Sequence, residues 1–98
     1  MSDQMTDLKS QIEISIDAME LQLKSSGEVV VTKYLEKYQK ALKAFDSGSP
    51  EYLEKCLRAL LNCARGYMEF SSSYDQVFLR EMWETENIIK KSLPDESG

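Results

Sequence analysis

The segment DSGSPEY, residues 46–52, contains the clearest break in the chain. Gly48 interrupts a helix, and Ser49 followed by Pro50 is a common helix start, because serine caps free N–H groups and proline fits the first helical turn. Glu51 places a negative charge at the positive end of the helix dipole. The segment therefore predicts that one helix ends near residue 46 and that another begins at residue 50.

Apolar residues recur every three or four positions on both sides of this break, which is the spacing of one helix face. Before the break, two such stripes predict helices at about residues 3–24 and 28–46, with Gly27 closing the first. After the break, one stripe runs from Leu53 to Met68, and a last one follows residue 77. The pattern predicts four helices.

The predicted fold class is therefore all-α, an antiparallel bundle of about four helices. Ninety-eight residues with 42% hydrophobic and 30% charged side chains suit a single domain over residues 1–98, with 94–98 as a frayed tail. An alternative joins the third and fourth helices into one kinked helix, because the serines at 71–73 weaken a helix without forbidding it.

The net charge of −5 argues against nucleic acid as a partner, because phosphate binding depends on clustered lysine and arginine. No segment approaches the roughly 18 uninterrupted apolar residues that a membrane span needs, so we expect no membrane segment and a cytoplasmic location. Three lysines on the second predicted helix are interpreted as a solvated face: Lys33, Lys37 and Lys40.

The residue types that most catalytic sites need are missing. The chain has no histidine, the commonest general base and metal ligand. Cys56 and Cys63 would lie roughly 10 Å apart along a helix, too far for a disulfide, and are predicted to be reduced core residues. Two cysteines alone do not make a conventional zinc site. We therefore expect a binding protein, with no catalytic residues, metal or cofactor.

Two acidic residues fall on the core side of the fourth predicted helix. Glu86 lies one turn after Met82, and Asp75 shares its side. A buried unpaired acid is costly, so each should find a cation or a polar helix end. Two interpretations follow: pairing at the bundle margin with an arginine such as Arg58 or Arg65, or a polar recess for a ligand or partner.

Some apolar and small residues lie outside the core stripes. Ile14, Ala18 and Leu21 form a second strip on the first helix, and Val77 and Ile88 do so on the fourth. These strips either contact neighbours within the bundle or form a docking face or homodimer seam. A small-residue strip on the third helix, flanked by Tyr52 and Phe70, would seat a neighbouring helix or a partner: Ala59, Cys63 and Gly66.

Negative charge is concentrated between residues 66 and 87, where five acidic residues face a single basic one, Arg80. The acids are Glu69, Asp75, Glu81, Glu84 and Glu86, and the aromatic residues close by are Phe70, Tyr74, Phe78 and Trp83. Acidic charge attracts a basic protein over a distance, and aromatic side chains anchor the contact. The segment is therefore a candidate protein-binding surface.

The stretch LLNCARGYMEFSSSYDQVFLREMWE, residues 60–84, resembles small helical immunity proteins that neutralise interbacterial toxins, particularly type VI secretion effectors that act in the cytoplasm. The shared features are a helix running into an acid–aromatic pair, a short polar break with an acid, and then an amphipathic helix. The resemblance implies a stoichiometric inhibitor that places acidic and aromatic side chains into or over the active site of a toxin domain.

In this interpretation Glu69, Tyr74 and Asp75 form the insert, and Glu81 and Glu84 extend it along the exposed helix face. The expected partner-binding residues are Glu69, Phe70, Tyr74, Asp75, Glu81 and Glu84. The alternative is a helical adaptor, secretion chaperone or regulatory subunit that acts through homo- or hetero-oligomeric helix packing.

Overall fold

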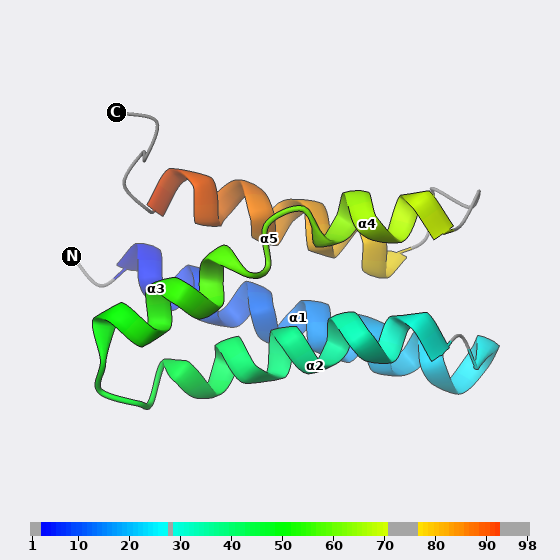
Figure 1. Ribbon diagram of the computed structural model, residues 1–98, viewed down its shortest axis with the longest axis horizontal. Coiled ribbons are helices and arrows are strands. Elements are labelled where there is room, and N and C mark those ends of the chain that lie inside the picture. The colour runs from blue at the N-terminus through cyan, green and yellow to red at the C-terminus, as the bar shows by residue number, and fades with distance from the viewer. Residues whose placement is uncertain (1–2, 28, 71–76, 93–98) are drawn as a thin grey trace.

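The computed structural model describes residues 3–27, 29–70 and 77–92. Within these ranges the chain forms helices and no strand (Figure 1), which confirms the predicted all-α class. The helices are α1 (Asp3–Ser26), α2 (Val29–Ala44), α3 (Pro50–Arg58), α4 (Cys63–Phe70) and α5 (Val77–Ser92).

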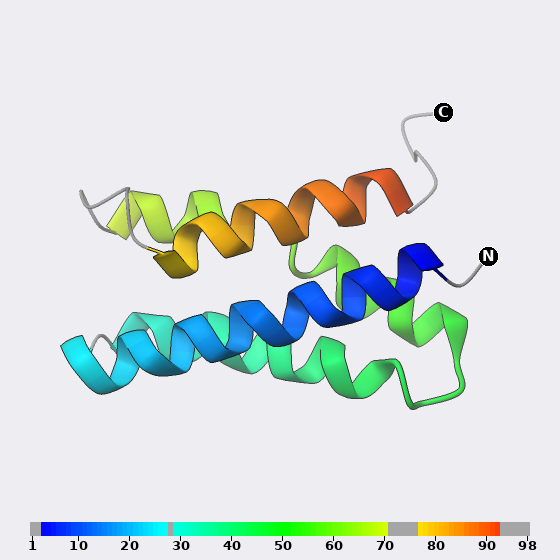
Figure 2. The ribbon, with the colours of Figure 1, turned by 180° about the vertical axis from the view of Figure 1, so that it is seen from behind.

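The helices form two layers. In one layer α1 and α2 run antiparallel, and in the other α4 and α5 run antiparallel, while α3 carries the chain from the first layer to the second (Figure 1). The most extensive contacts between helices are those of α1 with α5 and with α2. Seen from behind in Figure 2, α1 runs along both of these neighbours and is the central helix of the bundle.

The predicted helix boundaries are confirmed at two places. The Ser49 side chain accepts a hydrogen bond of 3.2 Å from the Tyr52 N–H, and Pro50 occupies the first turn of α3. Gly27 adopts a φ of 70°, and its N–H donates to the Leu23 carbonyl at 2.9 Å, which closes α1.

The third predicted helix is divided into α3 and α4 by a bend at residues 59–62. Hydrogen bonds from Leu60 to Leu57 and from Leu61 to Arg58, at 3.0 and 3.2 Å, tighten the end of α3. Asn62 then takes a φ of 72°, a left-handed conformation that asparagine tolerates better than most residues. The chain is redirected here, so that α4 lies on α5.

The third and fourth predicted helices do not form one kinked helix. The rings of Tyr67 in α4 and Phe78 in α5 meet edge to face, with centroids 4.9 Å apart. Eleven positions along a continuous helix would separate them by about 16 Å. The chain therefore turns back between α4 and α5; residues 71–76, which join them, lie outside the described part.

The core contains both cysteines. Cys56 and Cys63 are buried and free, which confirms the prediction of reduced core residues. Burial raises the pKa of the Cys63 thiol to about 11, although Lys37 and Lys33 partly oppose the shift. The thiol is therefore protonated near neutral pH and is a poor nucleophile.

Glu86 satisfies its buried carboxylate at the beginning of α4. Its side chain is 2% exposed, and it accepts a hydrogen bond of 2.9 Å from the Ala64 N–H. Burial raises the pKa of Glu86, while the N–H groups of Ala64, Asn62 and Cys63, together with the Lys90 charge, lower it. The polar helix end anticipated from the sequence is thus α4, whose first N–H groups have no acceptor within the helix.

The expected pairing of Glu86 with an arginine is not found among the described residues. Arg58 instead bridges Glu54 one turn earlier in α3, at 2.8 Å. Arg65 is exposed on α4. Asp75, the other acid predicted on the core side, lies outside the described residues.

Replacing Glu86 should destabilise the fold selectively. We expect Glu86→Ala to lower the free energy of unfolding by about 1–3 kcal/mol, because α4 loses its cap and buried N–H groups lose an acceptor. Glu84→Ala removes an exposed acid from the same helix and should change it by no more than about 0.5 kcal/mol. Urea unfolding measures both, and equal effects would contradict the capping role.

The raised pKa of Glu86 gives a pH dependence of known sign. The folded state holds the Glu86 proton more tightly than the unfolded chain, so this contribution to stability is complete below the unfolded pKa and is lost as pH rises through the folded pKa. Against Glu86→Gln, which does not titrate, the stability of the natural protein should therefore fall as the pH rises above the ordinary glutamate range of about 4. Urea unfolding of both proteins at increasing pH tests the sign; a constant difference would refute it.

Candidate functional site

The two antiparallel helix pairs bring four helix termini to one end of the bundle. At this end α1 ends, α2 begins, α4 ends and α5 begins, on the right in Figure 1. We call it the joint end. The segment predicted to bind a partner includes the last turn of α4 and the first turn of α5, which both lie at this end, whereas its residues 71–76 lie outside the described part.

Three apolar side chains at the joint end are largely exposed. Leu21 in the last turns of α1 is 68% exposed, Val29 at the start of α2 is 81% exposed, and Val77 at the start of α5 is 68% exposed. They are the most exposed large hydrophobic residues in the described part of the chain. Exposed apolar residues that gather in one region are typical of protein-binding surfaces.

The six predicted binding residues do not all lie in one place in the structure. Glu69 is exposed in the last turn of α4 and belongs to the joint end. Phe70 ends α4, while Tyr74 and Asp75 lie outside the described residues. Glu84 is exposed on α5, about two turns beyond the joint end. Among the predicted binding acids that the structure describes, Glu69 is therefore the exposed one that lies in a helix terminus at the joint end.

Glu81 takes part in the contact between α1 and α5. Gln11 donates from Nε2 to the Glu81 Oε1 at 2.8 Å and to the Glu81 carbonyl at 3.2 Å. Beside this pair, the buried hydroxyl groups of Ser15 and Thr85 lie 2.9 Å apart, and both are within hydrogen-bonding distance of the same carbonyl. Glu81 thus contributes to the packing of α5 on α1.

The predicted small-residue strip mainly seats α2. Cys63 is buried, and a Cβ added at Gly66 would lie 2.9 Å from the Tyr34 hydroxyl, so the absence of a side chain lets α4 approach α2. Burial raises the pKa of Tyr34, and Cys63 and Glu69 raise it further. The interpretation as a seat for a neighbouring helix is therefore confirmed at these two positions, whereas Ala59 remains exposed.

The second apolar strips are divided between the core and the surface. Ala18 and Ile88 pack against the core as partly buried residues. Ile14, Leu21 and Val77 remain exposed. Val29 was missed as a surface residue because α2 begins with three consecutive valines, and the sequence does not show which of them faces outward.

The described residues offer no conventional metal centre and no membrane helix. Within residues 3–27, 29–70 and 77–92, no three cysteine, aspartate or glutamate side chains come together in a way that could hold a metal ion. None of the described helices combines the length and apolar character needed to cross a bilayer. The described joint end therefore combines exposed apolar side chains with charges of both signs, among them Glu69 in α4 and Lys24 in the last turn of α1.

The fold and this surface define a small all-α bundle protein with exposed apolar side chains at one end. Residues 3–95 match the family model described as YeeD uncharacterised protein, and the chain belongs to the YeeD family. No curated protein and no solved structure matches it.

The role of Glu81 in packing can be measured with a double-mutant cycle. We expect Gln11→Ala and Glu81→Ala each to reduce the free energy of unfolding, with a coupling of about 0.5–1 kcal/mol between them, because their side chains share a partly buried hydrogen bond. The matched pair Gln11→Ala with Glu84→Ala should show no coupling. Coupling indistinguishable from zero in both cycles would mean that Glu81 does not stabilise the α1–α5 contact.

Proposed function

We propose that this YeeD-family chain is a non-catalytic binding protein of the cytoplasm, an immunity protein that neutralises a cognate bacterial toxin. It would do so by covering the toxin's active site with the joint end. The single observation that carries the proposal is that the exposed residues Leu21, Val29 and Val77 all lie near helix termini at the end of the bundle where α4 ends with the exposed Glu69.

Apolar and acidic residues would have separate tasks in such a contact. Burying Leu21, Val29 and Val77 against a partner would supply affinity, because the contribution grows with the apolar area removed from water. Glu69 and the net charge of −5 would attract a basic toxin surface and raise the association rate. Glu84 extends the acidic surface along α5.

A neutralisation assay tests this function. The partner to examine first is a secreted protein with a toxic C-terminal domain encoded beside this chain. The natural protein should restore growth to cells producing that domain, and Val77→Glu should weaken the complex at least about tenfold by placing a charge in an apolar contact. Lys43→Glu, in the last turn of α2 and away from the joint end, is the control for a changed charge.

The salt dependence of association provides a second measurement. The association rate constant should fall as ionic strength rises, and Glu69→Lys should reduce both the rate and its dependence on salt. Full protection by both Val77→Glu and Glu69→Lys would refute the joint end as the binding surface. Failure of the natural protein to bind or protect against the neighbouring toxin domain would count against the immunity function itself.

A helical adaptor, secretion chaperone or regulatory subunit remains the second candidate. It is favoured by Ile14, which is 48% exposed and lies two turns before Leu21 on the same side of α1, outside the joint end. Such a strip suits a helix of a second copy or another protein. Sedimentation separates the candidates: Ile14→Glu should dissociate an oligomer in the adaptor case and leave toxin binding intact in the immunity case.

A further inference from the structure

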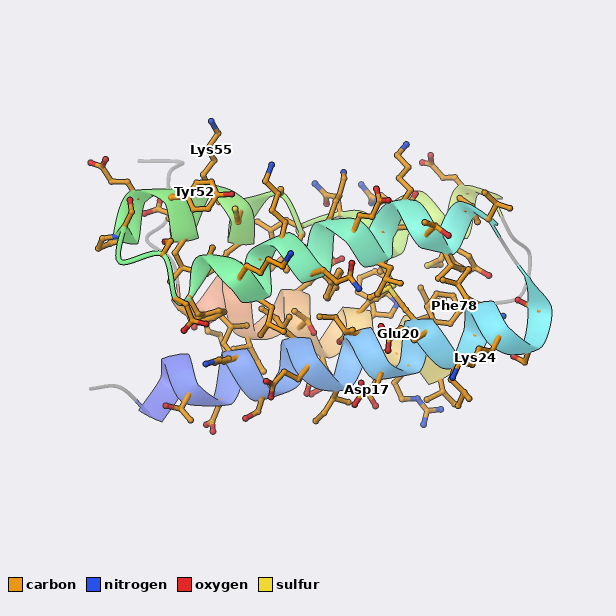
Figure 3. All side chains as sticks on the ribbon, turned by 90° about the horizontal axis from the view of Figure 1, so that it is seen from below. Asp17, Glu20, Lys24, Tyr52, Lys55 and Phe78 are labelled. Carbon is orange, nitrogen blue, oxygen red and sulfur yellow. The ribbon has the colours of Figure 1, made fainter. Side chains whose placement is uncertain are left out.

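A hollow of about 260 Å³ lies between α2 and α3. We call it the lysine groove, and its lining residues are Lys37, Lys40, Tyr52, Lys55, Cys56 and Ala59. Figure 3 places Tyr52 and Lys55 on α3, far along the bundle from Phe78, which lies at the beginning of α5. The groove is therefore separate from the joint end.

The groove has a positive rim on a chain whose net charge is −5. Lys37, Lys40 and Lys55 are all exposed, and none forms an ion pair with an acid in the described part of the chain. Glu54, an acid that shares a neighbouring hollow with Lys55, is bound by Arg58 at 2.8 Å. Glu51 also lines that neighbouring hollow, but no ion pair joins it to Lys55 in the described part of the chain. Three ammonium groups thus surround one depression that has no acid in its lining.

The interior of the groove is apolar. Tyr52 is 40% exposed and forms one wall, and its hydroxyl interacts with the Cys56 side chain, which raises the pKa of Tyr52. Ala59 caps the C-terminus of α3 in a right-handed helical conformation that other residues also adopt, so the backbone does not require alanine there. The small side chain of Ala59 leaves the depression open.

The size of the groove favours an anchor side chain over a complete small ligand. Pockets for drug-sized molecules usually occupy about 300–1,000 Å³, above the volume found here. Peptides, in contrast, are often held by one or two side chains in a hollow and by charges at its rim. Three separated lysines can then contact several carboxylates along one segment.

We propose that the lysine groove binds an acidic peptide segment of a partner protein, with one aromatic or aliphatic side chain in the hollow and flanking aspartate or glutamate on Lys37, Lys40 and Lys55. The charge of this site is opposite to that of Glu69, the predicted binding acid described at the joint end. The interaction is therefore additional to the proposed toxin contact, and the two sites can be occupied together.

Fluorescence anisotropy with labelled peptides tests the groove. The probes are EDLFDE and EDFWDE, with EDGGDE lacking the anchor and KKLFKK reversing the charge. We expect micromolar binding of the first two and at least about tenfold weaker binding of the others. Lys55→Glu and Ala59→Phe, the first reversing a rim charge and the second filling the hollow, should each weaken EDLFDE at least about tenfold.

Lys43→Glu is the matched control, because it makes the same change in net charge on α2 outside the groove. Circular dichroism establishes that each variant is folded. Three results would overturn the proposal. They are an equal loss of peptide affinity in Lys43→Glu and Lys55→Glu, equal binding of EDLFDE and EDGGDE, and no binding of either anchored peptide at a millimolar protein concentration. If inorganic phosphate at equal charge displaced EDLFDE, the groove would be a simple anion site and the proposal would be overturned. If Lys55→Glu abolished a dimer, the occupant would be a second copy of the chain, which would also overturn the proposal.

Discussion

The arrangement of the second helix layer depends on the contact between the Glu86 carboxylate and the beginning of α4. The Glu86 side chain is 2% exposed, so its carboxylate needs hydrogen-bond donors, and the first N–H groups of α4 need an acceptor. The Ala64 N–H meets both needs by donating to the Glu86 carboxylate at 2.9 Å. Eight residues make too short a helix to be stable alone, so α4 depends on such tertiary support. Because Glu86 belongs to α5, the contact also fixes α4 beside α5 and thereby brings the ends of both helices to the joint end.

The contact between α1 and α5 then determines which acids are available to a partner. Ser15, Thr85 and the Glu81–Gln11 pair form a row of polar contacts within an otherwise apolar packing. Such a row favours one register, because sliding α5 by a turn would leave buried hydroxyl groups without partners. It engages Glu81 in the bundle, while Glu69 and Glu84 remain exposed. Sequence spacing alone does not show which of these three described acids packs within the bundle and which remain exposed. That outcome depends on the register of α5 against α1.

The sequence predicted the helix class, two boundaries and most of the core because these follow from local signals: Gly27 closes α1, Ser49 and Pro50 begin α3, and apolar spacing identifies the buried faces. It did not predict the bend before α4, because the apolar stripe continues through residues 59–62 and Asn62 is the one local signal of a left-handed residue. The partner of Glu86 was anticipated only as a cation or a helix end, since the helix end it uses is created by that bend. The sequence placed Leu21 and Val77 on separate strips and did not bring them to one end of the bundle, for a related reason: the joint end is assembled from two pairs of helix termini, near residues 26–29 and 70–77, that are distant from each other in sequence.

The bend at residues 59–62 links the two surfaces proposed to bind partners. On its N-terminal side, α3 and Ala59 form one wall of the lysine groove, and on its C-terminal side α4 carries Glu69 to the joint end. Lys37 and Lys40 on α2 complete the groove, and α2 begins at the joint end with Val29. A basic groove and an end with exposed apolar side chains are thus held at a fixed separation by the same two segments, α2 and the bent α3–α4 pair. Because the described hydrogen bond of the Glu86 carboxylate goes to α4, loss of that carboxylate should disturb the joint end more than the lysine groove, so the two surfaces can be examined separately within one folded chain.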